Sequence, residues 1–282
     1  SYVRALLQSE HIRYVGLDEH MSMMEGSISA IPRRVMVDDG DLAKARRLLT
    51  DAGLGVPSGP AQRPKAAVPG HSDDAFLGGR LHILQPVKGF RAGLDAVMLA
   101  AAVPARERQT ICDLGSGVGT AGLCVAARVG TVQLTAVDID PQVLARATEN
   151  AQRNGLGSTF TTIEADLQGR ARNLPRQHFH HVLTNPPFHD DARGTRAPDS
   201  GKATARSIAG PALFHWLRLA RAIVRPRGTV SAILPPAQLA LAISALSEGG
   251  QGITLIPLWP AKDVPAKRMI VRAQMNSRAP MQ

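Results

Sequence analysis

The sequence predicts an α/β fold in which a mostly parallel sheet carries helices on both faces. From residue 110 onward, apolar segments of strand length alternate with segments of helical periodicity. Glycines, carboxylates, or an asparagine with two prolines follow several of the expected strands directly. Because ligands of such sheets bind at the carboxyl ends of the strands, we expect the functional site at that edge.

The elements of this large domain are expected in regular alternation. We expect strands at residues 110–115, 132–140, 159–167, 180–188 and 228–236, and helices at residues 121–128, 141–154 and 213–224. Pro141 favours a helix start, since the first helical position needs no backbone N–H.

A small α/β module is predicted before this domain. We expect helices at residues 1–10 and 41–53 and strands at residues 12–17 and 33–39. Residues 55–75 are rich in proline, glycine and small residues and lack apolar periodicity, which is typical of a linker. The predicted domains are therefore residues 1–54, a linker at 55–75, and residues 76–282. The module resembles a small ferredoxin-like family described as signal-transducing, which implies a binding or regulatory role.

Composition narrows the class of protein. The 33 Lys and Arg residues exceed the 23 Asp and Glu residues, so the net charge of +10 favours a polyanionic partner such as nucleic acid. Cys112 and Cys124 both lie in apolar segments, which favours buried, reduced thiols. Since the chain shows neither a membrane-spanning run nor a secretory pattern at its first residues, we expect a cytoplasmic protein.

A glycine-rich turn joins the first strand of the large domain to its helix. The segment CDLGSGVGTAGL contains Gly115, Ser116, Gly117 and Gly119, and glycines let a ligand approach the backbone closely. A tight turn without a ligand is the alternative. The spacing GxGxG after Asp113 resembles motif I of S-adenosylmethionine-dependent methyltransferases. This resemblance implies that Asp113 lies near the amino-acid part of S-adenosylmethionine.

Carboxylates end the next two strands. In the segment TAVDID, Asp138 lies at the end of the expected strand and is followed by Ile139. A carboxylate at this position can accept hydrogen bonds from both ribose hydroxyls of a nucleoside. Asp140 can instead cap the helix that Pro141 opens. Asp166 in EADL can accept a hydrogen bond from an adenine amino group, or can be a solvated turn residue.

The segment TNPPF ends the fourth strand. It matches the Asn-Pro-Pro-aromatic motif of methyltransferases that act on a conjugated nitrogen, chiefly the exocyclic amine of adenine. The side-chain oxygen of Asn185 and the carbonyl of Pro186 would accept hydrogen bonds from that amine as its charge develops, and Pro187 would help to stiffen the loop. Phe188 would stack on a flipped-out base. The alternative is an ordinary turn in which Asn185 caps and the prolines end the strand.

Two further segments narrow the resemblance. LQPVKGFRAGLDAVMLAAA, before the glycine turn, and the ending PLWPAKDVPAKRMIVRAQMNSRAP resemble the bacterial tRNA1(Val) adenine-37 N6-methyltransferase family over about residues 76–280. The resemblance implies a Rossmann-like class I methyltransferase with a mostly parallel seven-stranded sheet, S-adenosylmethionine as cofactor and tRNA as substrate. It also implies that Arg91 and Asp95 help to enclose the methionine end of the cofactor.

The motif is also compatible with methyl acceptors other than adenine. NPPFH also resembles the motif of ribosomal-RNA guanine N2-methyltransferases, and the glutamine N5-methyltransferases of release factors share Asn-Pro-Pro-Tyr. A non-catalytic RNA-binding protein of the same fold is a further alternative. The basic residues favour RNA, and those expected to contact it are Arg193, Arg196, Lys202, Arg206, Lys262, Lys267 and Arg268. His178, His180 and His181 lack a ligand pattern, and we expect no metal.

Overall fold

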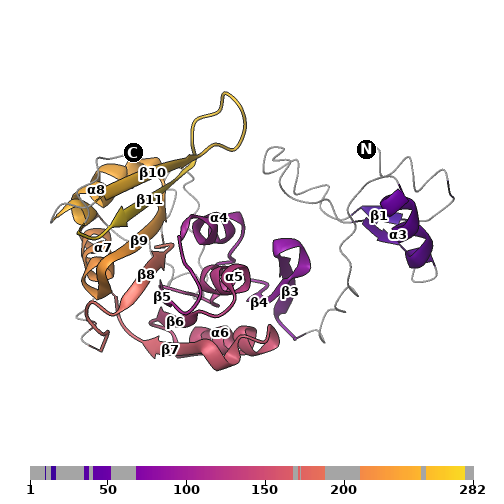
Figure 1. Ribbon diagram of the computed structural model, residues 1–282, viewed down its shortest axis with the longest axis horizontal. Coiled ribbons are helices and arrows are strands. Elements are labelled where there is room, and N and C mark those ends of the chain that lie inside the picture. Colours follow the sequence, from indigo (N-terminus) through magenta and orange to yellow (C-terminus); the bar gives the residue numbers. More distant parts are fainter. Residues whose placement is uncertain are drawn as a thin grey trace. The chain divides into compact units, whose positions relative to one another are not determined.

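The computed structural model describes Glu10 and residues 14–16, 35–37, 41–51, 68–167, 171, 173–187, 210–248 and 252–276 (Figure 1). The chain divides into two compact units, residues 1–63 with 260–264, and residues 64–259 with 265–282. No helix of the described residues is long and apolar enough to cross a membrane.

The first unit contains the elements that the sequence predicts after its first residues. β1 (Tyr14–Gly16) pairs antiparallel with β2 (Val35–Val37), and α3 (Leu42–Asp51) follows. The helix expected at residues 1–10 lies outside the described residues, apart from Glu10.

The second unit is built on a seven-stranded sheet of order β10-β11-β9-β8-β5-β6-β7. Its strands, in chain order, are β5 (Thr110–Leu114), β6 (Gln133–Asp138), β7 (Phe160–Glu164), β8 (Phe179–Thr184), β9 (Val224–Leu234), β10 (Gly252–Leu258) and β11 (Arg268–Gln274). β11 is antiparallel to both neighbours, while the pairs from β9 to β7 are parallel. The predicted mostly parallel, Rossmann-like sheet is confirmed.

Helices cover both faces of this sheet (Figure 1). α7 (Gly210–Ile223) and α8 (Leu239–Ser247) bury their apolar side chains in the same core as Cys112, Leu114 and Val182. α4 (Leu94–Ala102), α5 (Thr120–Val129) and α6 (Pro141–Arg153) pack with the alternate residues Ile111 and Leu183 in a second core. Both cysteines are buried free thiols, as expected. Short 3₁₀ turns lie at Leu77–Gly79, Gly157–Thr159 and Pro236–Gln238.

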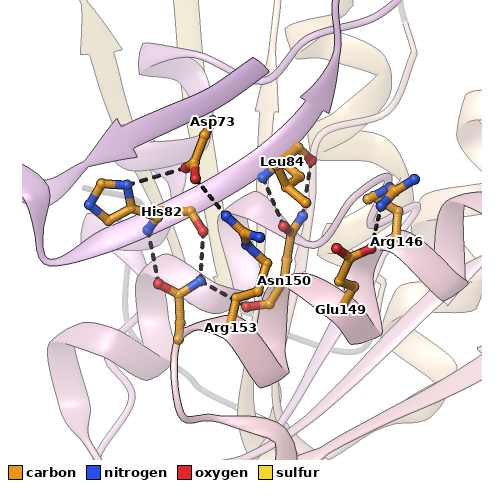
Figure 2. Close-up of polar contacts among 8 residues, drawn as sticks. Asp73, His82, Leu84, Arg146, Glu149, Asn150 and Arg153 are labelled. Atoms are coloured by element: carbon orange, nitrogen blue, oxygen red, sulfur yellow. Dashed lines mark hydrogen bonds and ion pairs between the residues drawn. The ribbon is translucent and has the colours of Figure 1, made fainter. Parts of the chain in front are cut away.

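A two-stranded hairpin, β3 (His71–Phe76) and β4 (Leu81–Pro86), packs against α6 (Figure 2). The Asn150 side chain bonds both the amide and the carbonyl of Leu84, at 2.8 and 3.1 Å, and Asn154 does the same for His82 at 2.9 and 2.6 Å. Asp73 accepts from Arg153 at 2.6 Å and contacts His82 Nδ1 at 3.2 Å.

This hairpin corrects the end of the predicted linker. The linker was expected to reach residue 75, but residues 71–75 belong to β3. The sequence of β3 shows no apolar pattern because its middle residues are polar. The contacts of Asp73 with Arg153 and His82 help to hold the hairpin in place instead. The division of the chain into functional domains stays a prediction.

Candidate functional site

The glycine turn lies at the carboxyl end of β5 and is held by backbone contacts to β6. The amides of Gly115 and Ser116 donate to the carbonyl of Val137 at 2.8 and 2.9 Å. Gly115, Gly117 and Gly119 have φ values of 73°, 53° and 85°, a region that disfavours side chains. Among the described residues, a Cβ at Gly117 would meet no heavy atom within 4 Å, so this part of the turn is open to a ligand.

Asp113 lies beneath this turn and is buried. Its carboxylate accepts a hydrogen bond from the amide of Gly122, near the start of α5, at 2.8 Å. Burial raises the pKa of Asp113 to about 7; the Gly122 hydrogen bond opposes this shift, and the nearby charge of Asp138 adds to it. A cation beside Asp113, such as the ammonium group of an amino acid, would favour its charged form.

Asp138 connects the glycine turn to the end of β6. One carboxylate oxygen accepts from the amide of Gly117 at 2.9 Å and the other from the amide of Asp140 at 3.2 Å. Each oxygen keeps a lone pair, so the carboxylate can still accept hydrogen bonds from ligand hydroxyls. Asp140 caps α6, accepting from Gln142 at 2.8 Å, so the two aspartates have different tasks.

Apolar and polar groups continue this edge beyond Asp138. The side chain of Ile139 is 52% exposed and provides an apolar surface next to Asp138 in the chain. Asp166 is exposed two residues after β7, and the neighbouring Ala165 amide donates to the carbonyl of Asp138 at 2.9 Å. The strand ends thus bring Asp138, Ile139 and Asp166 to one edge of the sheet.

Thr184 joins the Asn-Pro-Pro segment to the glycine turn. The paired positions of β5 and β8 end at Asp113 and Leu183, and the Thr184 hydroxyl extends this contact by donating to the carbonyl of Leu114 at 2.7 Å. Thr184 is fully buried, and its hydroxyl accepts a hydrogen bond from the indole N–H of Trp216 at 2.9 Å. Asn185 therefore follows a residue that is bonded directly to the end of β5.

Trp216 of α7 fixes both segments with one ring. A Cβ at Gly115 would lie 2.5 Å from Cζ2 of Trp216, so only glycine fits beside the ring. The same ring donates to Thr184, as described above. Asn185 is half-buried and Pro186 is buried. Among the described residues, no hydrogen bond engages the Asn185 amide, so its oxygen can accept one from a substrate.

The structure gives Arg91 and Asp95 partners within the protein. Arg91 pairs with Asp74 at 2.6 Å, and Asp74 also accepts from the buried Gln85 at 2.8 Å. Asp95, in the first turn of α4, pairs with Arg268 of β11 at 2.9 Å. These contacts order the segment between β4 and α4, and a role for Arg91 and Asp95 at the methionine end of the cofactor stays a prediction.

Several predicted residues lie outside the described part of the chain. These are Phe188 and the basic residues Arg193, Arg196, Lys202 and Arg206. Lys262 and Lys267 are exposed, in the connection between β10 and β11.

The histidines lie at the opposite end of β8. His181 contacts the Thr229 hydroxyl and the Gln109 side-chain oxygen, each at 2.8 Å. Burial, aided by His180, Arg225 and Arg128, lowers the pKa of His181 to about 4, so the ring is neutral at physiological pH. These contacts give His181 a role in the packing of the sheet.

Sequence reasoning missed Trp216, Thr184 and Asn150 as supports of the site. Asn150 donates to the carbonyl of Val118, next to Gly117, at 3.1 Å, and so links α6 and β4 to the glycine turn. In the sequence, Trp216 looks like the other apolar core residues of its helix, and it differs from them only in its indole N–H. The one signal that the sequence offered is the indole N–H, since a tryptophan in a buried helix usually needs a hydrogen-bond partner.

Comparisons with known proteins agree with this geometry. Residues 92–199 match the family described as "Methyltransferase small domain", and residues 1–53 match the family described as "Putative prokaryotic signal transducing protein". A Shewanella loihica protein named tRNA1(Val) (adenine(37)-N6)-methyltransferase is 30% identical over 60% of this chain and 70% of its own. A protein of the same name from Tolumonas auensis is 26% identical over 64% of this chain and 73% of its own.

A solved structure supports the assignment to the methyltransferases. It is the crystal structure of an Agrobacterium tumefaciens protein described as a predicted O-methyltransferase, with 29% identity and a TM-score of 0.55 over 67% of this chain and 84% of that one. The chain therefore belongs to the S-adenosylmethionine-dependent methyltransferase family of the tRNA1(Val) (adenine(37)-N6)-methyltransferases.

Proposed function

We propose that this enzyme methylates the N6 amine of an adenine in tRNA, with position 37 of tRNA1(Val) as its target. The observation that carries the proposal is the placement of Asn185 and Pro186 directly after Thr184, whose hydroxyl bonds the strand that leads into the glycine turn. The names of the relatives supply the substrate. A tRNA substrate would place the enzyme in the cytoplasm.

S-adenosylmethionine, when bound, supplies a methyl group on a positively charged sulfur. The residues expected to hold it are Gly117, through its open backbone, Asp138, through its free lone pairs, and Ile139, through its exposed apolar surface. Asp113 would stabilise the ammonium end from beneath the turn, and Asp166 would accept from the adenine amine of the cofactor.

Asn185 and Pro186 would act on the acceptor nitrogen. The lone pair of an exocyclic amine is delocalised into its ring, which makes the amine a weak nucleophile. Two acceptors directed at its hydrogens favour a pyramidal nitrogen and stabilise the positive charge that develops during transfer. Rate would come mainly from positioning, because the buried Thr184 and Trp216 hold the segment against the glycine turn.

The charge of the protein supports RNA as the acceptor. A net charge of +10 favours a polyanion over the neutral or acidic loop of a protein substrate. The connection between β10 and β11 places the exposed Lys267 near the carboxyl edge of the sheet.

A transfer assay with three acceptors tests the proposal. Unmodified tRNA1(Val), ribosomal RNA and a release factor are each incubated with the enzyme and methyl-labelled S-adenosylmethionine, then digested to nucleosides or amino acids. We expect label in N6-methyladenosine from the tRNA. Label in N2-methylguanosine or in methylglutamine would replace the adenine assignment, and RNA binding without transfer to any acceptor would favour a non-catalytic RNA-binding protein.

A further inference from the structure

Two aromatic side chains are exposed in the segments that precede α4 and follow β10. Phe90, between β4 and α4, is 62% exposed, and Trp259, directly after β10, is 58% exposed. Aromatic residues make up only 4% of the chain, and its other tryptophan, Trp216, is buried. Exposed aromatic rings at a functional edge commonly mark a binding surface.

One ion pair brings the two segments together. Leu258, the residue before Trp259, is paired in the sheet with Arg268, and Arg268 bonds Asp95 of α4 at 2.9 Å. The amide of Lys267 donates to the carbonyl of Leu258 at 3.1 Å. Phe90 precedes Asp95 by only five residues. Arg268, which the sequence predicts as an RNA contact, also joins the two segments.

Both segments carry cationic side chains. Lys88 and Lys267 are exposed, whereas Arg91 and Arg268 are paired with Asp74 and Asp95. Exposed rings together with lysines suit single-stranded nucleic acid, whose bases stack on the rings while its phosphates contact the cations.

We propose that Phe90 and Trp259, with Lys88 and Lys267, form a stacking surface for unpaired bases that flank the target adenine. This inference rests on the proposed RNA substrate. In the strand order β8-β9-β11-β10, Trp259 lies three strands from Asn185, about 14 Å across the sheet. A short single-stranded segment of RNA spans such a distance.

Tryptophan fluorescence tests the surface without any need for catalysis. The full-length protein is titrated with an anticodon stem-loop RNA, and separately with heparin, a polyanion that has no bases. We expect RNA to quench the emission of Trp259 and heparin to leave it unchanged, with the quenching absent from Trp259→Phe. Equal quenching by heparin, or none by RNA, would overturn the proposal.

Steady-state kinetics give the second test. Phe90→Ala and Trp259→Ala should each raise the KM for tRNA by roughly 5- to 150-fold, the range expected for one stacked base, with kcat little changed. Trp259→Phe keeps an aromatic face and should stay close to wild type. Val87→Ala is the matched control, since Val87 is an exposed apolar residue of the same loop without a ring.

The two tests separate this surface from the proposed function. If tRNA accepts methyl groups but neither alanine variant changes its KM, the stacking surface is wrong and the proposed function stands. If RNA quenches Trp259 but no RNA is methylated, the surface stands and the proposed function is wrong.

Discussion

Replacing Thr184 by valine tests whether its buried hydroxyl holds the Asn-Pro-Pro segment. Valine has nearly the same shape, so the change removes the hydroxyl with little loss of volume. It leaves two buried groups without this partner, the indole N–H of Trp216 and the carbonyl of Leu114. A buried polar group that loses its hydrogen bond costs about 1–3 kcal/mol, so we expect Thr184→Val to lower the free energy of unfolding by roughly 2–6 kcal/mol.

Thr184→Ser is the matched control. Serine keeps the hydroxyl and loses only a buried methyl group, which costs on the order of 1 kcal/mol. Urea unfolding of both variants measures the difference. If Thr184→Val is as stable as Thr184→Ser, the hydroxyl does not hold the segment and the reasoning fails.

A double-mutant cycle isolates the bond to Trp216. Trp216→Phe removes the N–H but keeps a ring, and Thr184→Val with Trp216→Phe leaves only the Leu114 carbonyl unpaired. We therefore expect the double variant to lose less stability than the sum of the two single variants. Strict additivity would show that the two side chains act independently. The activity of the folded Thr184→Val enzyme should also fall, because a displacement of about 1 Å at Asn185 can cost a hundredfold in rate.

Three further predictions concern the cofactor site, pH and the hairpin. Asp138→Ala should weaken S-adenosylmethionine binding by about 1.5–3 kcal/mol in calorimetry, and unchanged affinity would move the ribose contact to another residue. Because burial raises the pKa of Asp113 from about 3.9 when unfolded to about 7, the wild type should lose stability relative to Asp113→Asn as pH rises from about 4 to about 7. Since one pKa unit corresponds to about 1.36 kcal/mol, the free energy of unfolding of the wild type relative to Asp113→Asn should change by at most about 4 kcal/mol over this pH range, as measured by denaturation curves. If this free-energy difference did not depend on pH, the raised pKa of Asp113 would be contradicted. A fragment of residues 68–282 should fold and bind cofactor. A fragment of residues 77–282 should be less stable, because Arg153 loses its partner Asp73 and Arg91 loses its partner Asp74. Equal stability of the two fragments would show that the first strand of the hairpin adds nothing to stability.

The sequence was sufficient to predict the sheet and the order of its central motifs. Continuous apolar segments of strand length and helices with capping residues, such as Asp140 before Pro141, are local features that a sequence records directly. The glycine turn, Asp138 and the Asn-Pro-Pro segment could be brought together because parallel strands place their carboxyl ends at one edge.

Long-range polar contacts could not be predicted in the same way. β3 has polar residues throughout its middle, and one of them, Asp73, pairs with Arg153, which lies 80 positions away. Arg268 and Asp95 are separated by 173 positions, so sequence reasoning considered each residue alone and missed their ion pair. Their pairing depends on the register of β11, which no local pattern determines.

Nucleoside mass spectrometry of tRNA from cells that lack this protein tests the central claim most directly. We expect N6-methyladenosine to disappear from position 37 of tRNA1(Val), and the wild-type gene to restore it. Asn185→Ala should fail to restore it even though the variant binds S-adenosylmethionine normally, since its transfer rate should fall by at least about a hundredfold. Unchanged N6-methyladenosine in the deletion strain, or full restoration by Asn185→Ala, would contradict the account.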